Sequence, residues 1–172
     1  MKIKGLHFII TGGTIDSVYD GAKDTVVTSK KSIVPSFIGS VNLGYKTKFT
    51  QAAMKDSRNL QEKDLKKVLS LIKQSPYDKI IVTHGTYTMP DTARFLKAQL
   101  KKLKKTVVVT GSMIPILGFT PSDGTFNLGY AIGRIESLPH GIYVAMNGRI
   151  FSPEEVLKNL YSGTFTSIFG EK

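Results

Sequence analysis

The sequence of 172 residues contains no cysteine, so it can form neither a disulfide nor a thiolate metal site. It also lacks a long hydrophobic run, and no apolar stretch approaches the ~20 residues that a membrane-spanning helix requires. The apolar run at residues 6–10 is too short for the core of a secretion signal. These absences predict a cytoplasmic protein without a membrane segment.

Arginine is scarce as well. Only four of the 24 basic residues are arginine, although the net charge at pH 7 is +11. Arginine is the residue best shaped for bidentate contacts with phosphates and guanine edges. The densest lysine run, at residues 101–105, closes a predicted helix, where cations interact favourably with the helix dipole. The charge therefore favours a solvated surface, and a nucleic-acid partner remains the less favoured alternative.

What the sequence does contain is an alternation of strand and helix signals. Strands are predicted at residues 5–10, 46–53, 79–83, 106–110 and 141–146. Such strand–helix units imply parallel strands joined by right-handed crossovers. The predicted fold is an α/β domain, a three-layer, open, mostly parallel Rossmann-like sheet with helices on both faces. We expect a single domain over residues 1–172, with no further C-terminal domain.

The helices are predicted from apolar residues that recur on one face. One helix has Leu65, Val68, Leu69 and Ile72 on that face, after a capping box of Asn59 and Glu62. Another presents Ala93, Leu96, Leu100 and Leu103. Near the C-terminus, residues 152–155 predict a short helical turn that carries Lys158.

In open α/β sheets, ligands bind beyond the carboxyl ends of the strands. The loops at those ends contain the unusual residue clusters. In the first, Gly12 and Gly13 allow a tight turn, which is either purely structural or exposes backbone N–H groups for an oxyanion, and Thr14 adds a hydroxyl. In the second, Thr86 offers another hydroxyl, and His84 is either a base or a satisfied loop residue.

Taken together, these clusters resemble the L-asparaginase/glutaminase amidohydrolase family in order and spacing over nearly the whole chain. Four segments match: residues 11–15, residues 84–89 together with 92–93, residues 110–115, and residues 122–128. In addition, Lys158 follows Met146 at the twelve-residue distance of the family's active-site lysine. Residues 56–60 are similar to the loop that holds the substrate carboxylate in that family.

The resemblance implies a role for each matching residue. Thr14 would be the nucleophile that forms an acyl-enzyme, with Thr86 against Lys158 as the proton acceptor. Residues 16–31 would form a mobile lid with Tyr19 as its catalytic tyrosine. The substrate-binding residues would be Gly13, Ser57, Arg58, Gly85, Tyr87 and Ser112. The substrate would be a small amide or amino acid, with no metal and no cofactor.

The chain departs from the family pattern at Tyr87, where the family has an aspartate that pairs with the substrate's α-ammonium. A neutral phenol cannot replace that carboxylate, so the site would prefer an amide without an α-ammonium or would be silent. Full-length members also have a second domain that completes the neighbouring subunit's site, and the family assembles as dimers or larger. A homo-oligomer is therefore expected, and a non-catalytic ligand-binding protein on the same fold is the alternative function.

Overall fold

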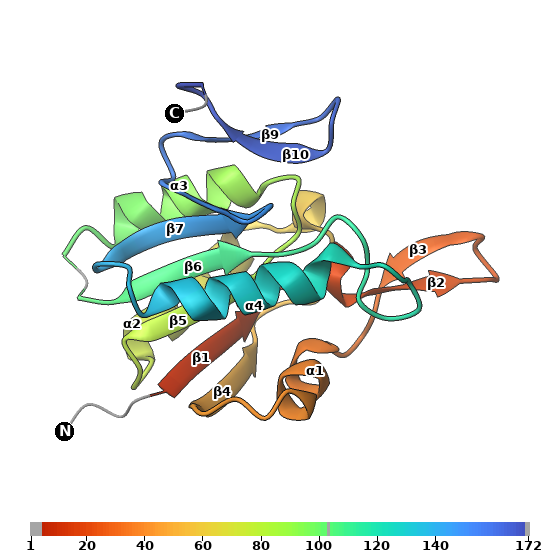
Figure 1. Cartoon of the computed structure of the whole chain (residues 1–172), viewed down its shortest axis with the longest axis horizontal. Coiled ribbons are helices and arrows are strands. Elements are labelled where there is room, and N and C mark those ends of the chain that lie inside the picture. The colour runs from red at the N-terminus through yellow and green to blue at the C-terminus, as the bar shows by residue number, and fades with distance from the viewer. Residues whose placement is uncertain (1–4, 103, 171–172) are drawn as a thin grey trace.

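The computed structural model describes residues 5–102 and 104–170. Its centre is a six-stranded sheet in the order β4-β1-β5-β6-β7-β8 (Figure 1). Neighbouring strands from β4 through β7 run parallel, and β8 pairs antiparallel with β7. The strands are β1 (Gly5–Ile10), β4 (Lys46–Gln51), β5 (Lys79–Thr83), β6 (Thr106–Thr110), β7 (Gly141–Met146) and β8 (Arg149–Phe151). This confirms the predicted mostly parallel sheet.

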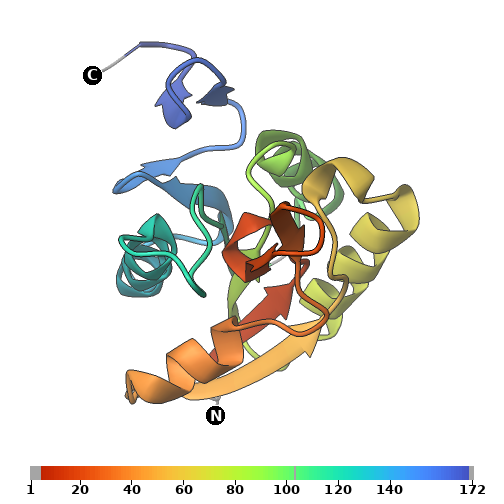
Figure 2. The same cartoon turned by 90° about the vertical axis from the view of Figure 1, so that its right-hand side faces the viewer.

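Helices cover both faces of the sheet, because side chains alternate between the faces along each strand. On one face, Leu6, Phe8 and Ile10 of β1 pack with α1 (Val34–Ser40) and α4 (Asp123–Ile135). On the other, Ile9 packs with α2 (Glu62–Gln74) and α3 (Met89–Gln99). The three layers are visible in Figure 2. Burial of each such large apolar side chain stabilises the fold by about 1.5–3 kcal/mol.

The helix boundaries differ in detail from the predicted ones. The capping box of α2 is formed by Gln61 and Asp64, not by Asn59 and Glu62, because Asn59 belongs to the preceding 3₁₀ turn η2 (Ser57–Asn59). The predicted face of α3 is buried at Ala93 and Leu96. Its last member, Leu103, lies outside the described residues.

Two hairpins lie beside the main sheet, each a two-stranded sheet of its own (Figure 1). One consists of β2 (Ser17–Asp20) and β3 (Thr25–Thr28), and the other of β9 (Val156–Asn159) and β10 (Thr164–Ser167). Residues 16–31, which the family resemblance implies to be a mobile lid, thus contain a regular β-hairpin. The helical turn predicted to carry Lys158 is wrong, because this residue lies on β9.

The β7–β8 turn shows a signal that the strand prediction overlooked. Asn147 and Gly148 both have positive φ, 53° and 73°. This is the conformation that two-residue hairpin turns require, and Asn-Gly is the dipeptide that most often supplies it. The Asn147-Gly148 dipeptide therefore predicts the reversal of the chain after β7.

No helix among residues 5–102 and 104–170 has the length and apolar character needed to cross a membrane.

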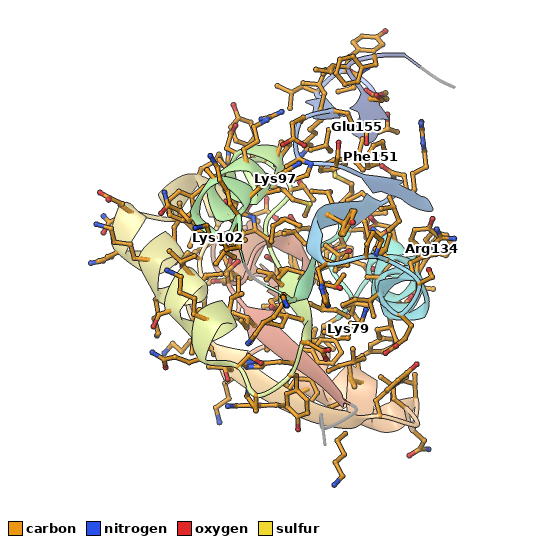
Figure 3. All side chains as sticks on the ribbon, turned by 90° about the vertical axis from the view of Figure 1, so that its left-hand side faces the viewer. Lys79, Lys97, Lys102, Arg134, Phe151 and Glu155 are labelled. Atoms are coloured by element: carbon orange, nitrogen blue, oxygen red, sulfur yellow. The ribbon has the colours of Figure 1, made fainter. Side chains whose placement is uncertain are left out.

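The positively charged side chains are spread over the molecule. Figure 3 places Lys97 and Lys102 on the α3 side and Arg134 on α4.

Candidate active site

The loops that follow β1, β5 and β6 start side by side because hydrogen bonding continues past the strand ends. The backbone N–H of Thr11 donates to the carbonyl oxygen of Thr83 (3.1 Å), and the N–H of His84 donates to that of Thr110 (2.8 Å). The hydroxyl of Thr11 also donates to Thr83 O (2.9 Å). The carboxyl edge of the sheet thus brings together loops that are far apart in the sequence.

Glycines allow these loops to approach closely. A Cβ placed on Gly13 would lie 2.4 Å from Cα of Gly85, and one placed on Gly85 would lie 2.7 Å from Cβ of Ser57. Both distances are shorter than any real contact, and Gly13 also has a φ of 86°. The glycines therefore pack the segments of Thr14, Thr86 and Ser57 against one another.

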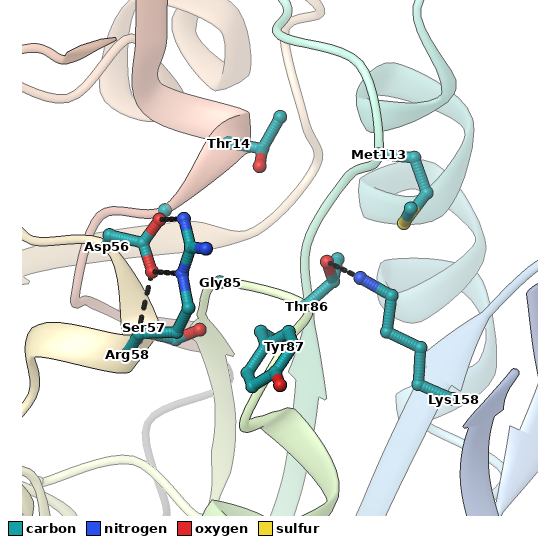
Figure 4. Close-up of a pocket in the computed structure, with 10 residues that line it drawn as sticks. Thr14, Asp56, Ser57, Arg58, Gly85, Thr86, Tyr87, Met113 and Lys158 are labelled. Carbon is teal, nitrogen blue, oxygen red and sulfur yellow. Dashed lines mark hydrogen bonds and ion pairs between the residues drawn. The ribbon is translucent and has the colours of Figure 1, made fainter. Parts of the chain in front are cut away.

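A pocket of about 220 Å³ lies among these segments (Figure 4). In Figure 4 the Thr14 hydroxyl is directed into the space between this residue and Thr86. The pocket is lined by Gly13, Thr14, Asp56, Ser57, Arg58, Gly85, Thr86, Tyr87, Met113 and Lys158. Its volume is below the usual range for drug-sized ligands and suits a small metabolite.

Lys158 reaches the pocket from β9, and its Nζ donates to Oγ1 of Thr86 at 2.7 Å (Figure 4). Burial and the nearby Arg58 lower the pKa of Lys158, while Asp56 opposes the shift. A lowered pKa favours the neutral amine, which is the form that accepts a proton. The Thr86 hydroxyl and the Lys158 amine thus form a hydrogen-bonded pair in the wall of the pocket.

Asp56 and Arg58 form an ion pair on the opposite wall. Arg58 donates from Nε to Oδ1 (3.0 Å) and from Nη2 to Oδ2 (2.8 Å), and its backbone N–H donates to Oδ1 (2.8 Å). These bonds hold the pKa of Asp56 below its usual value. The guanidinium lies 5.7 Å from the centre of the Tyr87 ring.

His84 is buried behind the pocket and acts as a structural bridge. Its Nδ1 lies 2.7 Å from Gly85 O, and its Nε2 lies 3.0 Å from Thr92 Oγ1. Burial lowers its pKa to about 4, so the ring is neutral at pH 7. Nδ1–H then donates to Gly85 O, and Nε2 accepts from Thr92, which favours the satisfied-residue interpretation over a base.

A chain of side-chain amides links the α4 motif to the hairpin that carries Lys158. Asp123 accepts from the backbone N–H groups of Met113 (2.9 Å) and Ile114 (2.8 Å), and from Asn127 Nδ2 (2.9 Å). Asn147 donates its N–H to Asn127 Oδ1 (3.3 Å). Asn147 Oδ1 in turn accepts from the N–H of Phe165 on β10 (2.8 Å). These hydrogen bonds connect the loop after β6, the first turn of α4 and the β9–β10 hairpin.

Two residues expected at the site lie elsewhere. Ser112 is fully buried, and its neighbour Met113 lines the pocket. Tyr19 is 57% exposed on β2 and donates its hydroxyl to Asp24. The β2–β3 hairpin instead borders an open hollow of about 610 Å³, which shares Thr14, Asp56, Arg58 and Met113 with the pocket.

Sequence reasoning did not single out Asp56 or Met113 as site residues. Asp56 could have been found, because it directly precedes Ser57 in the matched carboxylate loop. Met113 could not have been found, because its side chain has no group typical of catalysis or polar binding.

Within residues 5–102 and 104–170, no cluster of three His, Asp or Glu side chains could hold a metal ion.

Comparison with known proteins identifies relatives over almost the whole chain. The family model described as "Asparaginase, N-terminal" matches residues 5–168. The chain is 31% identical to a glutaminase-asparaginase of Acinetobacter glutaminasificans over 94% of its own length and 52% of that protein. It is also 31% identical to L-asparaginase 2 of Bacillus subtilis, over 95% of its length and 46% of that protein. The chain thus spans about half the length of these relatives.

Solved structures with a similar fold also include L-asparaginases. The chain is similar to L-asparaginase I from Vibrio cholerae, with a TM-score of 0.83 and 25% identity over 96% of this chain and 51% of that one. A thermostable L-asparaginase from Thermococcus kodakarensis gives a TM-score of 0.79 and 28% identity over 95% and 51%.

Proposed function

The chain belongs to the asparaginase family, and we propose on that basis that it is an amidohydrolase that hydrolyses a small side-chain amide, L-asparagine or a related compound. The observation that carries the proposal is the meeting, in one pocket, of the two threonine hydroxyls with Lys158. Each comes from a different loop or strand, and nothing in their sequence spacing requires them to converge.

The first step is an attack by Oγ1 of Thr14 on the amide carbon, which forms a C–O bond and a tetrahedral oxyanion. Backbone N–H groups of the glycine turn stabilise this oxyanion. The C–N bond then breaks, ammonia leaves and a Thr14 ester remains. Water hydrolyses the ester, releases the carboxylate product and restores the hydroxyl.

A threonine hydroxyl is a weak nucleophile and needs a proton acceptor. Lys158 has this role in the proposal, because burial and Arg58 lower its pKa and its Nζ lies 2.7 Å from Thr86 Oγ1. The Thr14 proton passes through the Thr86 hydroxyl to the neutral amine of Lys158. The resulting ammonium then gives this proton to the amide nitrogen as the C–N bond breaks, so that ammonia leaves.

The test is ammonia release from a panel of small amides by the parent and by Thr14→Ala. Loss of the nucleophile should lower kcat by 10³-fold or more, and Thr14→Ser, which keeps a hydroxyl, should retain measurable turnover. Equal ammonia release by parent and Thr14→Ala would reject the assignment. A mass increase of the parent, but not of Thr14→Ala, after rapid quenching would support the acyl-enzyme.

The alternative is a ligand-binding protein that turns over little or nothing. The presence of a phenol at Tyr87 motivates it, since this residue lines the pocket where the family resemblance calls for a carboxylate. Thermal-shift measurements with amides and amino acids separate the two functions. Binding without ammonia release would favour the alternative, and robust turnover would exclude it.

Self-association and a cytoplasmic location complete the proposal. Exposed apolar side chains on and after the β9–β10 hairpin, Leu160, Tyr161 and Phe169, support a homo-oligomer. A solved relative from Campylobacter jejuni is named a probable cytoplasmic L-asparaginase (29% identity, TM-score 0.79). Light scattering after size-exclusion chromatography gives the molar mass, and a monomer at all concentrations would contradict self-association.

A further inference from the structure

The side chains that line the pocket offer positive charge but no unpaired negative charge to an amino-acid substrate. Among the lining residues, Arg58 and Lys158 are basic, and Asp56 supplies the carboxylate. This carboxylate already accepts three N–H groups of Arg58, two from the guanidinium and one from the backbone. Its charge is thereby neutralised within the wall of the pocket.

A zwitterionic amide such as L-asparagine brings one carboxylate and one ammonium. Its ammonium would meet no unpaired carboxylate among the lining residues, and it would lie near the positive charge of Arg58. An unpaired charge removed from water is costly. To bind Asp56, the ammonium would have to displace a bidentate arginine, which is among the strongest partners of a carboxylate.

The side chain at the centre of this argument is Tyr87. Figure 4 shows its ring between Arg58 and Thr86 among the residues that line the pocket. The ring is 52% exposed and faces the Arg58 guanidinium, so its face already interacts with a cation of the protein. A neutral phenol offers a substrate ammonium no countercharge.

A substrate carboxylate, in contrast, finds suitable partners. The guanidinium of Arg58 keeps N–H groups beyond the two that bind Asp56. Ser57 lines the same pocket, and Lys158 adds positive potential when protonated. The volume of about 220 Å³ suits a ligand with a short chain.

We propose that the pocket selects a monoanionic ω-amide of a short dicarboxylic acid, of which succinamate is the four-carbon case, over a zwitterionic amino-acid amide. This inference rests on the proposed hydrolytic function for its reaction. The reaction balances as succinamate plus water giving succinate plus ammonium, without any oxidant or further co-reactant.

The experiment compares succinamate with L-asparagine, which differs from it only by the α-ammonium. Ammonia release gives kcat/KM for both substrates with the parent, Tyr87→Asp and the matched control Tyr87→Phe. The parent should prefer succinamate by about tenfold or more, since a charge-assisted contact is missing for asparagine. Tyr87→Asp should shift the ratio towards asparagine by roughly 10–100-fold, and Tyr87→Phe by less than about twofold.

A second measurement does not depend on turnover. Calorimetric titration of Thr14→Ala with succinate and with L-aspartate compares the binding of the two products. Tighter binding of succinate supports the inference even where no ammonia is released, in which case the proposed hydrolysis fails alone. Hydrolysis with a preference for asparagine, or tighter binding of aspartate, overturns the inference and leaves the hydrolytic function standing.

Discussion

The two hairpins beside the central sheet are held in different ways. The β9–β10 hairpin is anchored in the core: Val156 is fully buried and Phe165 is 2% exposed. Arg94 of α3 donates from Nη2 to Val156 O (2.8 Å), and Lys97 forms an ion pair with Glu154 (2.6 Å). These contacts therefore hold the backbone of the hairpin, and with it that of Lys158, in place.

The β2–β3 hairpin has little of this support. Tyr19 and Val26 are 57% and 42% exposed. The hairpin is held mainly at its base, where Ser29 N–H donates to Asp16 O (2.9 Å) and the Ser17 hydroxyl donates to Gly13 O (3.0 Å). Regions with few buried apolar contacts open at low free-energy cost.

The comparison shows what a hairpin needs in order to hold a side chain at a fixed position. Lys158 reaches Thr86 across 72 residues of sequence because buried side chains fix its strand. Tyr19, on a strand without such an anchor, bonds to Asp24 in its own hairpin. Burial on one face of the hairpin therefore decides which of the two can hold a group at a fixed position.

The largest effect should come from removing the group that the anchored hairpin presents. Lys158→Met keeps the length of the side chain but loses the amine, so kcat should fall by about 10³-fold, within the range for a general base. Lys66→Met on α2 is the matched control, because it breaks only the exposed ion pair with Glu62 and should change kcat less than about twofold. Steady-state ammonia release measures both, and equal effects of the two changes would contradict a special role for Lys158.

The buried side chains that anchor the β9–β10 hairpin should contribute measurably to the free energy of unfolding. Phe165→Ala removes a buried ring and should lower the free energy of unfolding by about 3–5 kcal/mol. Val26→Ala on the exposed hairpin should change it by about 0.5 kcal/mol or less. Urea denaturation followed by circular dichroism gives both values. Similar losses for the two variants would show that both hairpins are equally anchored.

The charges around Lys158 offer a finer test. Burial lowers the pKa of Lys158 most, Arg58 lowers it further and Asp56 raises it. Arg58→Gln removes the lowering charge and frees Asp56, so the pKa of Lys158 should rise and the acid limb of the kcat profile should move to higher pH. Asp56→Asn should move the same limb to lower pH. Profiles at saturating substrate measure both shifts, and movement in one direction for both variants would exclude Lys158 as the titrating base.

Much of this architecture could be predicted from the sequence. The β-branched run of β6, with Val107, Val108 and Val109 fully buried, identifies a central strand by composition alone. The parallel order then places the loop residues at one edge of the sheet. Lys158 is one lysine among many, and only the family resemblance, through its distance of twelve residues from Met146, identifies it.

The remaining features depend on tertiary contacts. Strands as short as β8, β9 and β10 carry too few residues for a clear period, and only packing of side chains such as Phe165 defines them. The bidentate bond between Asp56 and Arg58 requires the 3₁₀ turn that brings the two side chains together. Ser112 follows a strand end as Thr86 does, yet packing against α4 hides it.

The smallest effect is expected from the exposed hairpin. Tyr19→Phe removes only the hydroxyl that bonds to Asp24, and from the position of the hairpin kcat should change less than about twofold. Asp24→Asn weakens the same contact from its other side and should behave alike. A loss of 100-fold or more for Tyr19→Phe, with Asp24→Asn near the parent, would contradict this. It would show that the hairpin closes over the pocket during turnover and that Tyr19 has the catalytic role implied by the family resemblance. The difference between the two hairpins would then be one of timing, because one is held in place before substrate binds and the other only afterwards.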